Sequence, residues 1–200
     1  DNIARFTDGR FTPRANELVA EVHSRDMIEE PDGLPAVESL RGVEQPRADV
    51  PAVLLLTEEE GRLEEFEPAT LDLRATATLA ASRLRSPQAV GSAVTAFERE
   101  ALADIAERAG VAAQPLTTGE PGALADWAAA NDASQIVTGY VPQGPLRDWL
   151  DAAVPELAKR GITIAEYRRA WDTAIWPHAT AGFFRVKKQI PDILKATGLR

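Results

Sequence analysis

The segment TGYVPQGP, residues 138–145, is the first place where residue types and spacing suggest binding of a phosphate-bearing ligand. It follows a predicted strand and leads into a predicted helix, where open α/β sheets hold their ligands. Its two glycines have the spacing of a phosphate loop, but Pro145 and Leu146 replace the Lys and Ser or Thr of a Walker loop. The pattern still predicts a candidate crevice for a cofactor or nucleotide, lined by Thr138, Gly139, Tyr140, Gln143 and Gly144. As an alternative, the Gly and Pro residues only shape the turn and Tyr140 caps the sheet.

Three consecutive carboxylates, Glu58 to Glu60, follow another predicted strand. At the carboxyl end of a parallel strand they could bind a cation or act as an acid and base pair. Consecutive residues point in different directions, however, so the favoured interpretation is a solvated helical turn. The same carboxylates would repel a pyrophosphate, and the chain has no GxGxxG fingerprint. Arg147 and Asp148, at the start of the helix predicted over 146–157, are interpreted as a local ion pair.

The stretch WDTAIWPHATAGFF, residues 171–184, holds four of the twelve aromatic residues and one of the two histidines. His178 has no orienting partner in the sequence, which favours a hydrogen-bonded structural histidine over a general base. Neither histidine has a partner at metal-ligand spacing, and there is no cysteine or GxSxG elbow, so we predict no catalytic residue and no metal site. The stretch is interpreted as an aromatic docking segment whose interface residues are Trp171, Trp176, His178, Phe183 and Phe184.

Strands and helices must alternate to position these residues. Short apolar or alternating runs predict strands, and apolar residues at steps of three and four predict helices. The alternation predicts an α/β fold, a Rossmann-like three-layer sandwich with a mainly parallel sheet. The predicted strands are 52–57, 71–75, 111–116, 134–140 and 162–167, and the predicted helices are 94–109, 121–131 and 146–157.

Outside this core we expect an N-terminal helical arm and a C-terminal aromatic tail docked on the sheet. The arm is a helix over 13–28 followed by a Pro-rich and Gly-rich linker over 29–50. In the tail, Phe183, Val186, Ile190 and Leu194 are expected to pack inward. The predicted domains are therefore 1–50, continuing from an upstream domain, and 51–200, the Rossmann-like domain.

Composition narrows the possible partners. The 200 residues include no cysteine and no apolar run long enough to span a membrane, which predicts a cytoplasmic protein without membrane contact. The net charge of −9 is uneven, because residues 144–200 carry ten Lys and Arg against six Asp and Glu. The acidic remainder should repel nucleic acid, and the basic excess is weak beside the basic stripes of nucleic-acid-binding proteins.

The order of motifs from about 122 to 190 resembles the second half of the Rossmann-like antenna domain of the photolyase and cryptochrome family. The resemblance rests on the helix ALADWAAANDAS, the strand QIVTGY with its YVPQGP turn, the Arg147–Asp148 pair opening a helix, and KRGITI. The segment 182–191 is similar to the one that leaves that domain. Coverage is about a third of the chain. The acids after the strand 52–57 depart from the family's arginine-rich loop and argue against an antenna chromophore of the usual kind.

The resemblance implies an auxiliary, non-catalytic domain of a FAD-dependent flavoprotein that repairs DNA as a deoxyribodipyrimidine photolyase-type lyase or senses light. FAD would then bind to a helical domain of the same polypeptide and not to these 200 residues. That helical domain would be the partner of the aromatic tail, and DNA would be contacted only through it.

A different interpretation is a self-contained nucleotide-binding α/β module, similar to universal stress proteins, that uses the 138–144 turn. The stretch DASQIVTGYVPQGP fits this loosely, although glycines and hydroxyls after the strand are few. An interaction domain without any ligand is the third alternative, since fold alone does not exclude it.

Overall fold

The computed structural model describes residues 2–11, 36 and 38–199. By its internal contacts the chain divides into two compact units, Asp1–Glu38 and Ser39–Arg200. The described part of the first unit contains helix α1 (Asn2–Phe6). The helix predicted over 13–28 and the start of the predicted linker lie outside the described residues. The last part of that linker, residues 39–50, belongs to the second unit and forms no helix or strand; we call it the arm.

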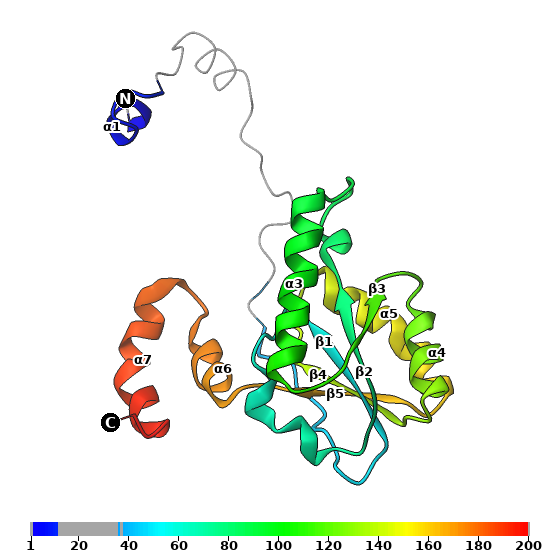
Figure 1. Ribbon diagram of the computed structural model, residues 1–200. Coiled ribbons are helices and arrows are strands. Elements are labelled where there is room, and N and C mark those ends of the chain that lie inside the picture. Colours follow the sequence, from blue (N-terminus) through cyan, green and yellow to red (C-terminus); the bar gives the residue numbers. More distant parts are fainter. Residues whose placement is uncertain (1, 12–35, 37, 200) are drawn as a thin grey trace. The chain divides into compact units, whose positions relative to one another are not determined.

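The second unit is organised around a five-stranded sheet in which every strand pair is parallel (Figure 1). The strand order is β3-β2-β1-β4-β5, so the chain grows outward from β1 in both directions. This confirms the predicted Rossmann-like α/β class. The strands are β1 (Ala52–Thr57), β2 (Leu73–Ala80), β3 (Gln114–Thr117), β4 (Gln135–Gly139) and β5 (Thr163–Tyr167).

Helices cover both faces of the sheet and make the structure three-layered (Figure 1). Successive side chains of a strand point to opposite faces, and all six residues of β1 are buried. Val53 and Leu55 pack into the layer of α4 and α5, whereas Leu54 and Leu56 pack into the layer of α3. The three helices, each predicted from its apolar period, are α3 (Ser92–Arg108), α4 (Gly122–Ala130) and α5 (Pro145–Lys159).

Two strands begin later than predicted because local turns take up their first residues. Before β2, the Leu71 N–H donates to the carbonyl of Pro68 at 3.1 Å and closes a 3₁₀ turn. Before β3, the Val111 N–H donates to the carbonyl of Ala106 at 3.1 Å and closes the end of α3. β3 is an edge strand, where Pro115 is tolerated although it has no N–H to donate.

The C-terminal tail consists of α6 (Ala170–Ile175), a 3₁₀ turn (Trp176–His178) and α7 (Gly182–Ala196). The expectation that Phe183 packs inward is wrong, because its side chain is 64% exposed. Of the apolar residues expected to face inward in α7, none is fully buried, whereas Ile193 is 6% exposed. Val186, Ile190 and Leu194 do face α6, where they line a groove together with Ile193, so the predicted stripe is correct except for Phe183. None of the described helices has the length and apolar character needed to span a membrane.

Candidate functional site

The point where the sheet order reverses lies between β1 and β4, and open α/β sheets bind ligands outside the carboxyl ends of such strands. Of the predicted crevice residues, Thr138 and Gly139 end β4, while Tyr140, Gln143 and Gly144 form the turn into α5. The structure therefore brings all five to the expected end of the sheet. Their role in binding a cofactor stays a prediction.

At Gly139, next to this reversal point, there is no space for a larger side chain. A Cβ placed on Gly139 would lie 2.2 Å from Cβ and 2.5 Å from Cγ of Glu60. Glu60 is only 4% exposed, so its side chain fills the place next to the end of β4. Beside it, Thr138 is completely buried, and its hydroxyl has no hydrogen-bond partner among the described residues.

Glu60 is held by its own loop and by the start of the tail. Its Oε1 accepts the Arg62 N–H at 3.0 Å, and its Oε2 lies 3.3 Å from Nε of Arg169, which also donates to Asp172 at 2.9 Å. Burial raises the pKa of Glu60, an effect that the hydrogen bond from Arg62 opposes. The side chain of a buried glutamate, whose pKa burial raises, thus closes the sheet's reversal point.

The solvated helical turn expected for the three carboxylates is wrong. Glu58 and Glu59 are half-buried and both pair with Arg85, at 2.9 and 2.5 Å. Burial raises the pKa of Glu58 as well. In the described residues no group of three or more His, Asp or Glu side chains is arranged to hold a metal ion.

Tyr140 lies among cationic and aromatic groups. Its ring is 4.9 Å from the guanidinium carbon of Arg41 and 5.3 Å from that of Arg168. The Trp176 ring is tilted against it at 5.4 Å, which joins the turn to the tail. Cation–π contacts of this kind hold the ring, which is 7% exposed, in place. The other predicted crevice side chain, Gln143, is exposed and donates to Asp148 at 3.3 Å.

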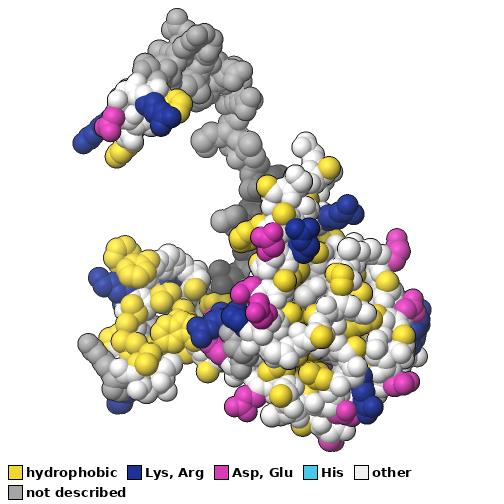
Figure 2. All heavy atoms as spheres, in the orientation of Figure 1, with side chains coloured by type: hydrophobic (Ala, Val, Ile, Leu, Met, Phe, Trp, Pro, Cys, Tyr) yellow, Lys and Arg dark blue, Asp and Glu magenta, His cyan; other side chains and the backbone are white. Residues whose placement is uncertain are grey.

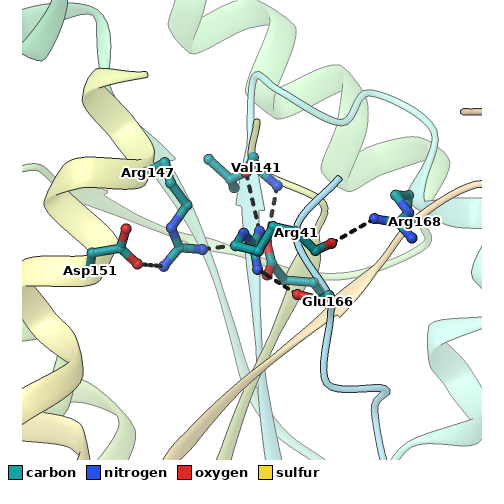
Figure 3. Close-up of polar contacts among 7 residues, drawn as sticks. Arg41, Val141, Arg147, Asp151, Glu166 and Arg168 are labelled. Carbon is teal, nitrogen blue, oxygen red and sulfur yellow. Dashed lines mark hydrogen bonds and ion pairs between the residues drawn. The ribbon is translucent and has the colours of Figure 1, made fainter. Parts of the chain in front are cut away.

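A charged network lies at the carboxyl end of β5 (Figure 3). Arg41 of the arm donates to both carboxylate oxygens of Glu166, at 2.6 and 2.9 Å. Glu166 also accepts the Val141 N–H at 3.0 Å and lies 3.5 Å from Nη1 of Arg147. The hydrogen bond to Glu166 raises the pKa of Arg41. The network pins the arm to the sheet at one buried carboxylate, whose side chain is 3% exposed.

Arg147 differs from its predicted role. It is 3% exposed and pairs with Asp151, one helical turn later, at 2.6 Å, rather than with Asp148. Residues four apart on a helix face each other and adjacent residues do not, which explains the difference. The enclosed Nε of Arg147 has no hydrogen-bond partner within the described chain, so this guanidinium keeps an unused donor.

A cavity of about 520 Å³ opens between α5, β5 and the arm, next to this network. Apolar side chains form one part of its wall, and two arginines, Arg41 and Arg147, lie with three carboxylates at its polar end. None of the five predicted crevice residues lines it. The lining residues are Arg41, Glu44, Arg147, Asp151, Val154, Leu157, Ala158, Gly161, Ile162, Thr163, Ile164 and Glu166.

Sequence reasoning missed Arg41 and Glu166. They are 125 residues apart, and Arg41 lies in a segment without periodicity. One signal was present: in ITIAEY, the glutamate is the only charged residue of the strand. A carboxylate that a strand buries requires a cationic partner, so this position predicts an arginine or lysine somewhere opposite.

The predicted interface residues all lie in the tail. Trp171, Phe183 and Phe184 are 44%, 64% and 73% exposed, and Trp176 and His178 are half-buried. His178 lines a depression of about 270 Å³ with Pro177, Thr180, Arg185 and Gln189. Their role as an interface stays a prediction.

No family model matches this chain, and no curated protein matches it. Among solved structures, a universal stress protein in complex with cAMP is similar, with 19% identity and a TM-score of 0.34. The match covers 64% of this chain and 98% of that chain. At these values the likeness carries no argument about ligand or activity.

The predicted membership of the photolyase and cryptochrome family is corrected: no family model matches the chain, and the similar solved structure is a universal stress protein. The expectations of a FAD cofactor, a role in DNA repair and light sensing are withdrawn with it. The motifs behind the resemblance have local explanations here. Tyr140 packs against two guanidiniums, Arg147 pairs along α5, and Gly161 has the positive φ, +69°, that ends this helix.

Proposed function

We propose that residues 39–200 form a self-contained nucleotide-binding α/β module, with the ligand in the 520 Å³ cavity between α5, β5 and the arm. The observation that carries the proposal is the pairing of two guanidiniums, Arg41 and Arg147, at the polar end of a cavity whose opposite wall is apolar; the carboxylates Glu44, Asp151 and Glu166 also line it. A cytoplasmic location remains part of the proposal.

The cavity has the size and lining of a small-molecule site. Such sites typically enclose about 300–1,000 Å³, and they combine apolar walls with a few convergent polar groups. Val154, Leu157 and Ile164 provide an apolar wall against which a planar base can lie. A guanidinium recognises phosphate through several N–H donors at once. A ligand with a flat apolar part and an anionic end matches this combination.

Charge at the polar end favours an anion. Arg41 and Arg147 share Glu166, whose carboxylate is buried, and Asp151 has a side chain that is 58% exposed and therefore well solvated. Glu44, the third carboxylate of the lining, is exposed to solvent, and the side chain of Arg41 is 38% exposed. Two guanidiniums thus face a single buried carboxylate. The reversal point offers the opposite environment, because Glu60 fills it and would repel a phosphate.

The test is ligand binding by calorimetry and thermal unfolding, with cAMP, AMP and ATP as probes. At about one hundred times Kd, a ligand that binds only the folded state stabilises it by about 2.7 kcal/mol, which raises the midpoint by several degrees. We expect at least one of the three nucleotides to produce this shift.

A matched pair of variants locates the site. Ala158 lines the cavity and Ala152 does not, and both are exposed on α5. We expect Ala158→Trp to block the cavity and abolish the shift, whereas Ala152→Trp retains it. If no nucleotide binds, the proposed function is wrong. If both tryptophan variants bind equally well, the cavity is not the site.

A further inference from the structure

Helix α7 carries an exposed apolar surface. Phe183, Phe184 and Ile190 are 64%, 73% and 38% exposed, and Trp171 of α6 is 44% exposed. Figure 2 shows hydrophobic side chains gathered over the α6 and α7 region, with basic side chains at its margin. Exposed apolar residues that occur singly need no explanation, but a contiguous group marks an interaction surface. We call α6 and α7 with these side chains the tail surface.

The tail surface includes a shallow groove of about 220 Å³ between the two helices. Every residue that lines it is apolar: Trp171, Ile175, Val186, Ile190, Ile193 and Leu194. Ile193 is 6% exposed and holds α7 against α6, so the helix pair is fixed while its outer residues stay open.

The charge of α7 indicates what the surface contacts. Residues 182–200 contain five Lys and Arg and a single acid, Asp192. The other 181 residues contain 17 basic and 30 acidic side chains. Lys187 Nζ lies 5.9 Å from the centre of the Phe184 ring, so cation and aromatic ring share one side of the helix. Two such tails would repel each other, which disfavours pairing of α7 with a second copy.

We propose that the tail surface docks on an anionic lipid surface. A helix with aromatic and aliphatic residues on one side and Lys or Arg beside them lies in the membrane interface, where the rings enter the acyl boundary and the cations contact headgroups. A helix bound in this way lies on the membrane and does not cross it. The expectation of no membrane contact rested on the missing span alone, so the proposal departs from it. It does not depend on nucleotide binding.

The test is co-sedimentation of the full chain with vesicles of phosphatidylcholine, with and without phosphatidylglycerol. We expect binding only to the anionic vesicles, weakening as salt is added. The double variant Phe183→Ser, Phe184→Ser is expected to lose binding. Phe97→Ser is the matched control, because Phe97 is 74% exposed on α3, as exposed as Phe184.

Charge reversal tests whether the lysines of α7 contact the lipid headgroups. Lys187→Glu with Lys188→Glu should reduce partitioning onto anionic vesicles by more than about tenfold, since each basic residue near such a surface contributes appreciably. Absence of binding to phosphatidylglycerol vesicles overturns the proposal. So does equal loss in Phe97→Ser, or binding that charge reversal leaves unchanged. Light scattering that shows dimers dissolved by the Phe183→Ser, Phe184→Ser variant would assign the surface to a second copy instead.

Discussion

Glu60 and Glu166 are both buried carboxylates at the carboxyl end of the sheet, and their surroundings have opposite consequences. Glu166 accepts two hydrogen bonds from Arg41 and one from the Val141 N–H, and a cavity remains open beside it. Glu60 accepts one backbone N–H and lies 3.3 Å from Arg169, and it fills the space next to Gly139. Glu166, which has several hydrogen-bond donors around it, therefore holds a distant segment in place. Glu60, which has fewer, itself occupies the site where α/β sheets usually bind ligands.

Removing the charge of Glu166 should have the largest effect. In Glu166→Gln, Arg41 and Arg147 lose the anion they share, and breaking a buried pair typically lowers the free energy of unfolding by about 3–5 kcal/mol. Urea unfolding measures the loss. Glu156→Gln is the control, because that carboxylate pairs with Lys159 on the surface and should contribute less than about 1 kcal/mol. Equal losses in the two variants would show that the network does not stabilise the fold.

Adding a methyl group at Gly139 tests the closed reversal point. Gly139→Ala should lower the free energy of unfolding by about 1–3 kcal/mol, because the new Cβ overlaps the side chain of Glu60. Gly61→Ala is the control from the same region, where an added Cβ meets nothing within 4 Å. Combining Gly139→Ala with Glu60→Gly should restore much of the loss. Without that coupling, the loop of Glu60 does not pack on β4 as described.

The smallest effect is a pH dependence at Glu60. Burial raises the pKa of its carboxyl above the ordinary value of 4.5, so ionisation costs the folded state more than the unfolded one. The stability that the neutral carboxyl contributes is fully present below pH 4.5 and is lost as pH rises through the raised pKa. Relative to Glu60→Gln, the unaltered chain should therefore be most stable in acid and lose that advantage toward neutral pH. Urea unfolding over this range checks the sign, and a difference that grows with pH would contradict it.

The features that local sequence patterns determine could be predicted from the sequence. The strands and helices of the core were predictable because their apolar patterns are local, from the continuous run of β1 to the three-and-four steps of α5. The order of these elements also predicts at which end of the sheet the candidate sites lie. Boundaries failed where one hydrogen bond decides them, as at Leu71 and Val111.

The sites themselves depend on pairings that no local pattern contains. The sequence places Arg147 next to Asp148, but helix geometry pairs it with Asp151. The contact of Glu60 with Gly139 and that of Arg41 with Glu166 each join segments separated by many residues. A single sequence shows that Glu166 needs a cation, and it does not show which of the 22 Lys and Arg residues supplies it.

The attachment of the arm has a consequence for folding order. The Glu166 N–H donates to the Glu44 carbonyl at 2.8 Å, and the Arg47 N–H donates to the side chain of Gln135 at 3.1 Å. The Arg41–Glu166 contact closes a loop of 125 residues, a large entropic cost that is recovered only once β5 is in place. The arm should therefore join last and leave first, in an opening smaller than global unfolding. Amide exchange at Glu166 would then report the lifetime of one cavity wall, while β1 continues to report the lifetime of the whole domain.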